Sequence, residues 1–164
     1  MRGLKFAAIA SVSLLLVTGI LVGYLFLTAE VQVADIKAEG ISVATNPQAF
    51  EALKRSIDEE TFYGTLFQKP AEWKEASEYV VLTYTLNVRN NCLVPIDMLE
   101  VQVVPQSYDI LQFPDLEVKS VDLKSDAEIQ VQILAPKDTH PIREMIVTYY
   151  LWGVSGNIKT VYGQ

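Results

Sequence analysis

The chain has little of what most small secreted domains and enzymes depend on. It contains one cysteine, so no intrachain disulfide can form and the fold must depend on its hydrophobic core. It contains no Asn-x-Ser/Thr sequon. Both absences are unusual for a small domain of an animal secretory pathway, and they favour a bacterial source.

Catalytic and metal-binding motifs are also scarce. The only histidine, His140, lies in a loop-like stretch with Pro141, and Cys92 follows a predicted strand as a small filler or an exposed thiol. No Walker loop, G-x-S-x-G, H-E-x-x-H or EF-hand spacing occurs. The acidic run 58–60 is interpreted as a solvated segment, and nothing in the spacing of Asp109, Asp115 and Glu117 requires a calcium ion. We therefore expect no enzyme activity, no metal and no cofactor.

Charge is missing from Phe6 to Leu27, which carries no Asp, Glu, Lys or Arg. A helix of this length reaches roughly 33 Å, enough to cross a hydrocarbon core of about 30 Å. Arg2 and Lys5 precede the run and Glu30 follows it. Because basic flanks stay in the cytoplasm, this predicts residues 1–5 inside, a transmembrane helix over 6–27 and a domain over 28–164 outside, in the plasma (inner) membrane.

A cleaved signal peptide is the alternative for the same segment. The apolar run is longer than the 7 to 15 residues of a typical signal core, and no small-x-small cleavage pattern follows it cleanly. A lipoprotein signal is excluded, because the single cysteine lies at position 92. We expect an uncleaved signal-anchor.

The part of the chain outside the anchor is acidic, and the anchor itself contains small residues. From Glu30 onward there are 11 basic and 20 acidic residues, a net charge of −9. This speaks against nucleic acid and against tight adhesion to anionic headgroups. Gly19 and Gly23 form a G-x-x-x-G spacing, which predicts a possible homodimer through the transmembrane helix.

Alternation of apolar and polar residues dominates the remainder. Such strands are predicted over 31–45, 79–89, 99–104, 110–113 (a short edge strand), 116–123, 127–133, 142–152 and 158–162. Gly40 allows a bend or a bulge in the first strand, and residues 153–157 are predicted as the loop of a closing hairpin. Seven or eight strands with little helix predict a mainly β protein, an antiparallel two-sheet sandwich of immunoglobulin or fibronectin type III kind.

A helical and aromatic insertion is predicted at 46–77. Asn46-Pro47 starts a short helix whose apolar face includes Phe50, Leu53 and Ile57. The stretch 61–76 then brings together the aromatic residues that we name as candidate partner-binding side chains, Phe62, Tyr63, Phe67 and Trp73. Burial as a cap on the sandwich is the alternative role. We expect Phe67 and Trp73 to be core residues and Tyr63 to be exposed.

The strand Tyr79–Asn91 followed by Val94-Pro95-Ile96 resembles the central strands of immunoglobulin-like domains on anchored bacterial proteins. It is also similar to the water-stress-hypersensitivity domains of late embryogenesis abundant proteins, although Asn90-Asn91 stands where that family has Asn-Pro. The resemblance covers about 70 residues and implies a binding or protective module, with no catalytic residue to carry over.

Two functional hypotheses follow. The first is a non-enzymatic, membrane-anchored extracytoplasmic interaction module that binds a protein partner in the envelope. The second is a small-ligand-binding receptor or enzyme with a site under residues 61–76.

Overall fold

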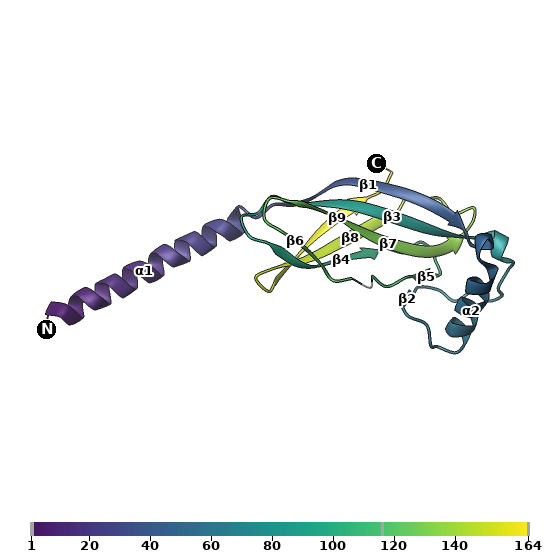
Figure 1. The fold of residues 1–164 in the computed structure, drawn as a ribbon, viewed down its shortest axis with the longest axis horizontal. Coiled ribbons are helices and arrows are strands. Elements are labelled where there is room, and N and C mark those ends of the chain that lie inside the picture. The colour runs from purple at the N-terminus through teal and green to yellow at the C-terminus, as the bar shows by residue number, and fades with distance from the viewer. Residues whose placement is uncertain (1, 116, 164) are drawn as a thin grey trace.

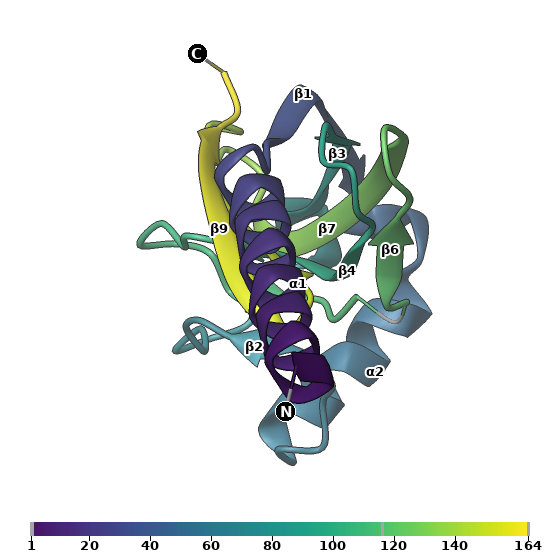
Figure 2. The ribbon, with the colours of Figure 1, turned by 90° about the vertical axis from the view of Figure 1, so that its left-hand side faces the viewer.

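The computed structural model describes residues 2–115 and 117–163. Helix α1 (Arg2–Leu27) projects from one end of a β domain (Figure 1). Its segment Lys5–Leu27 is long and apolar enough to cross a membrane. The most apolar part of this segment contains no residue that is buried by the rest of the protein. Seen from the helix side, α1 lies in front of the domain between β9 and β6 (Figure 2).

The β domain begins three residues after α1. Its strands are β1 (Val31–Ser42), β2 (Thr65–Leu66), β3 (Tyr79–Asn90), β4 (Ile96–Val103), β5 (Leu111–Gln112), β6 (Lys119–Val121), β7 (Asp126–Pro136), β8 (Glu144–Leu151) and β9 (Val154–Val161). Its helical elements are η1 (Val43–Thr45), α2 (Pro47–Asp58) and η2 (Ala76–Glu78). These strands and helical elements are those found among residues 2–115 and 117–163.

The strands form two antiparallel sheets, so the prediction of a mainly β sandwich is confirmed. In the part of the chain that the structure describes, one sheet has the order β1-β3-β7-β5-β2 and the other β6-β4-β8-β9. The alternation predicted for β3, β4 and β7 places one face of each strand in the core, with Leu86, Val101 and Ile129 at 4% exposure or less. The apolar faces of the two sheets pack against each other because this contact removes their apolar surface from water.

A second hydrophobic cluster fills the end of the sandwich opposite α1. Helix α2 starts where predicted: Asn46 accepts a hydrogen bond from the Ala49 amide, and Pro47 occupies the first turn. Its Phe50 and Ile57 are buried against this cluster. We call this end, with α2 and η2, the distal end, and the end that carries α1 the anchor end (Figure 1).

Several predicted boundaries are wrong. Strand β1 stops at Ser42, and its register shift lies between Val33 and Asp35 rather than at Gly40, which pairs in regular register with Leu82. Of the predicted strand over 116–123, residue 116 lies outside the described residues, and the strand found in the remainder is β6, Lys119–Val121. The predicted loop 153–157 is mostly strand β9, because a two-residue turn at 152–153 is enough to reverse the chain.

One prediction about strand position also fails. The 110–113 segment is not an edge strand, since β2, from the aromatic insertion, pairs with β5 and takes the edge position. Only tertiary pairing between distant segments could reveal this. Cys92 is buried at 1% exposure, which leaves its role as an apolar filler and removes the exposed-thiol alternative.

Candidate functional site

The aromatic insertion divides into three partly buried side chains, Phe62, Phe67 and Trp73, and one exposed side chain, Tyr63. Phe67 packs against the main core, while Phe62 and Trp73 pack against the distal cluster. The Trp73 ring meets Phe50 edge-on at 5.8 Å between centroids. Tyr63 is 80% exposed, as expected for it from the sequence.

Backbone geometry explains why Tyr63 faces outward. After α2, Glu60 takes a left-handed conformation with φ of 56° and reverses the chain. Gly64 has φ of +132°, and a Cβ there would lie 2.4 Å from the Gln112 carbonyl oxygen. Only glycine fits this close approach, so the chain passes tightly over β5 while the preceding side chain turns away from the domain.

A cleft of about 440 Å³ adjoins Tyr63 on the open side of the sandwich, between the β2–β5 edge and β4. We call it the Tyr63 cleft. Exposed large side chains of Met98 (55% exposed) and Val118 (82%) line it together with Tyr150. Tyrosine and methionine are enriched at protein interfaces. The cleft is therefore suited to an apolar anchor from another protein.

Met98 reaches this cleft through a bulge in β4. The register of β4 with β8 shifts between Asp97 and Glu100, and Met98 adopts φ of 52°. Bulges commonly redirect a side chain, and a left-handed non-glycine residue persists only where its surroundings hold it. Met98 was not identified from the sequence. The available signal was the adjacent apolar pair Met98 and Leu99, which interrupts the alternation of apolar and polar residues in this strand.

Carboxylates surround the apolar part of the Tyr63 cleft. Glu100, Asp115 and Glu117 line it, and no Lys or Arg is among its described lining residues. The floor includes Gln112, which joins the two sheets: its Oε1 accepts from the Val103 amide at 2.9 Å, and its Nε2 donates to the Val101 carbonyl at 3.0 Å. The cleft thus has a fixed floor and an acidic rim.

Two further clefts lie at the distal end. One of about 520 Å³ runs between α2 and the sheet and is mostly apolar, with Ile41, Leu53 and Phe113 among its lining residues. The other, of about 230 Å³, lies beneath residues 68–74 and is bordered by Lys74, Tyr108 and Lys137. The second corresponds to the place where sequence reasoning put an alternative ligand site.

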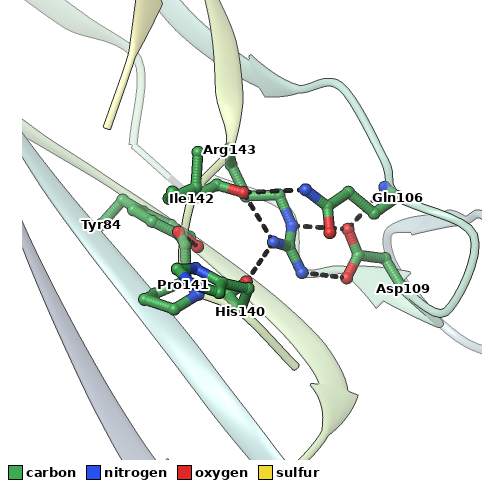
Figure 3. A network of polar contacts seen from close by, with 7 residues as sticks. All are labelled: Tyr84, Gln106, Asp109, His140, Pro141, Ile142 and Arg143. Atoms are coloured by element: carbon green, nitrogen blue, oxygen red, sulfur yellow. Dashed lines mark hydrogen bonds and ion pairs between the residues drawn. The ribbon is translucent and has the colours of Figure 1, made fainter. Parts of the chain in front are cut away.

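The densest polar network is buried and therefore serves the fold. Arg143 and Asp109 are both fully buried; Nε and Nη2 of the arginine donate to Oδ2 and Oδ1 at 2.8 and 2.7 Å (Figure 3). Arg143 also donates to the carbonyls of His140 and Ile142. His140 contributes its backbone carbonyl to this network, and the side chains of Arg143 and Asp109 are 0% exposed.

Titratable groups elsewhere are perturbed by ordinary structural causes. Burial raises the pKa of Tyr84 to about 12, while its hydroxyl donates to the Pro141 carbonyl. The hydrogen bond from Lys69 lowers the pKa of Asp58, and that from Arg89 lowers the pKa of Asp126. Within the described residues no group of three or more His, Cys, Asp or Glu side chains is arranged to hold a metal ion.

The other candidate residues lie apart from these clefts. Gly19 and Gly23 are on α1, where a Cβ built at either position would meet none of the described residues within 4 Å. Asp109 is bound to Arg143, so it is not grouped with Asp115 and Glu117. No protein-family model matches this chain, and no curated protein sequence matches it.

Proposed function

We propose that this protein is a membrane-anchored, non-enzymatic interaction module that binds a protein partner of the bacterial envelope through the Tyr63 cleft. In this proposal α1 is the anchor, the N-terminus is cytoplasmic and the β domain is extracytoplasmic. The supporting observation is the cleft itself, where Tyr63, Met98 and Val118 expose large side chains.

The chemistry of the cleft indicates the kind of partner. Its apolar side chains, Tyr63, Met98 and Val118, would contact an aromatic or aliphatic side chain, and its three carboxylates would pair with basic residues beside that anchor. The acidic balance of the whole domain acts in the same direction, since it attracts a positively charged surface. We infer a partner segment with an apolar anchor flanked by lysine or arginine.

Co-purification from gently solubilised membranes tests this proposal. Tyr63→Ala and Met98→Ala should abolish recovery of a stoichiometric protein partner while leaving the melting temperature almost unchanged, because both side chains are mainly exposed. Tyr108→Ala is the matched control: Tyr108 is 70% exposed but lies at a different cleft. Full partner recovery by both cleft variants would contradict the proposal.

A second candidate function is a small-ligand receptor or enzyme with its site beneath residues 61–76. The observation that favours it is the cleft of about 230 Å³ under residues 68–74, with Lys74 and Lys137 at its border. A co-purifying small molecule that is lost in Tyr108→Ala, and kept in Tyr63→Ala, would support this alternative over the protein partner.

The weak resemblance to water-stress-hypersensitivity domains accords with a binding or protective role in either case. Self-association through Gly19 and Gly23 remains a part of the proposal, supported by the open helix surface at both positions. Replacing both glycines with isoleucine should remove any dimer seen by cross-linking in membranes.

A further inference from the structure

The anchor end of the sandwich carries one exposed, large apolar residue on each of three loops. These are Leu93 in the β3–β4 loop, Leu123 in the β6–β7 turn and Trp152 in the β8–β9 turn, at 54%, 53% and 50% exposure. The strand register puts all three loops at the end from which α1 leaves, where Val31 pairs with Asn90 and Asp126 with Arg89 (Figure 1).

The β8–β9 turn does not itself require a tryptophan at position 152. The β8–β9 turn has φ of 50° at Trp152 and 79° at Gly153, positions where a hairpin favours Asn or Asp followed by glycine. A bulky aromatic residue in the left-handed region is disfavoured locally. A residue that opposes local preference without filling the core indicates a role outside the fold.

The junction between α1 and the β domain places these loops beside the C-terminal end of α1. The Phe26 ring contacts Trp152 edge-on at 5.5 Å between centroids, and Leu25, Phe26 and Ala29 pack against the main core. Three residues connect α1 to β1, a span of at most about 10 Å. If α1 crosses the bilayer and ends at Leu27, the loops must lie at the membrane surface.

The loops are also fixed relative to one another. The buried Asn90 side chain donates to the carbonyls of Val94, Val121 and Asp122, which ties the β3–β4 loop to the β6–β7 turn. Lys124 donates to the Asn91 carbonyl. Leu93 and Leu123 are therefore held relative to one another, and the contact with Phe26 holds Trp152 against the end of α1, so little conformational entropy would be lost on binding.

The geometry points to the lipid bilayer as the occupant of this surface. Leu93, Leu123 and Trp152, which we call the membrane-seating residues, insert into the boundary between headgroups and acyl chains and hold the domain in one orientation on the leaflet. Tryptophan is enriched at this depth because its ring is apolar and its N–H stays near water. The inference rests on the proposed membrane anchoring by α1.

The charges at the anchor end decide which force drives insertion. The carboxylates there, Glu30, Asp97, Asp122 and Asp126, outnumber the cations Arg89 and Lys124. Arg89 is already paired with Asp126 at 2.9 Å. Burial of apolar side chains, rather than attraction to anionic lipid, therefore drives the contact, and binding should depend little on phosphatidylglycerol or salt.

Tryptophan fluorescence of the full chain in phosphatidylcholine vesicles tests the inference. The protein has two tryptophans, so Trp73→Phe leaves Trp152 as the sole reporter and Trp152→Phe leaves Trp73 at the distal end. Lipids brominated on the upper acyl chain should quench most of the Trp152 emission and leave Trp73 emission unchanged. The Trp152 signal should also be shielded from aqueous acrylamide.

A second pair of variants protects the test against misfolding of Trp73→Phe. In a chain that keeps Trp73 and carries Trp152→Phe, Leu123→Trp places a second reporter on another loop at the anchor end, and Tyr108→Trp places it on an exposed distal loop. We expect bromolipid quenching for Leu123→Trp and none for Tyr108→Trp, with and without phosphatidylglycerol.

Flotation of the same vesicles separates the two possible failures. If the protein floats with the vesicles but neither Trp152 nor Leu123→Trp is quenched more than Tyr108→Trp, the seating inference is wrong and the anchor stands. Quenching that requires phosphatidylglycerol would contradict apolar insertion. Failure to float would overturn the anchor, and the seating inference with it.

Discussion

The Arg143 guanidinium and the Asp109 carboxylate form a bidentate ion pair with both side chains fully buried (Figure 3). The pair joins the loop after β4 to the residue that precedes β8. The Gln106 amide adds a third hydrogen bond to Asp109, at 2.9 Å, and the Gln106 side chain donates to the Ile142 carbonyl. The two loops at the distal end are therefore held by one connected network.

Breaking this ion pair should be among the most destabilising single changes in the domain. Asp109→Ala or Arg143→Ala leaves an unpaired buried charge, and we expect each to lower the free energy of unfolding by about 3–5 kcal/mol. Urea denaturation of the soluble fragment from residue 31 measures the change. The exposed neighbouring pair Lys159–Glu144 supplies the control, because Lys159→Ala should cost no more than about 1 kcal/mol. Equal effects at both pairs would contradict a structural role for Arg143.

Tyr84 should make the domain lose stability at alkaline pH. Its pKa is raised to about 12 in the folded protein by burial, against about 10 in the unfolded chain. The unfolded chain therefore releases this proton first, so its contribution is fully present below pH 10 and is lost as the pH rises towards 12, by up to roughly 3 kcal/mol. Comparing Tyr84→Phe with the wild type at each pH isolates this contribution from the other tyrosines and the lysines. Parallel pH profiles for the two proteins would contradict it.

The four aromatic residues of the insertion should separate into two classes. Phe67→Ala and Trp73→Ala should each cost about 2–4 kcal/mol, because both rings pack against core clusters, and Phe62→Ala should also destabilise the domain. Tyr63→Ala should change stability by less than about 0.5 kcal/mol. Melting temperatures of the four variants provide the measurement. Comparable destabilisation by Tyr63→Ala would show that its ring packs against the domain and would remove it from the proposed site.

The proposed direction of insertion predicts how proteases reach the domain. With Arg2 and Lys5 before the apolar run and Glu30 after it, protease added outside intact spheroplasts should digest the β domain. A cytoplasmic protein in the same sample should stay intact as the lysis control. Digestion of the domain only after lysis would reverse the proposed orientation.

Local patterns carried most of the fold prediction. The alternation around Leu82 and Val131 marked buried strand faces, and both residues are buried at 7% and 4% exposure. Asn46-Pro47 marked the start of α2 because capping is a short-range interaction. The β2–β5 pair and the β1 register shift were not predicted, since each depends on partners distant in the chain.

The candidate site shows the same division. Tyr63 was identified from composition and from its neighbour Gly64, both of which are local features. Met98, Val118 and Tyr150 were not, because they belong to segments that meet Tyr63 only after the two sheets have packed. Asp109 was considered from the sequence only as a calcium ligand together with Asp115 and Glu117, and its partner Arg143 lies 34 positions away.

The sequence by itself determined an apolar segment long enough to cross a membrane, the mainly β class, the acidic domain and the start of α2. These properties follow from composition and from periods of two or of about 3.6 residues, which act over a few positions. Only the tertiary structure decided that Arg143 and Asp109 are paired, that the Tyr63 cleft exists and that Leu93, Leu123 and Trp152 share one end. Each of these depends on which strands pair and in which register, because pairing brings together side chains that no local pattern connects.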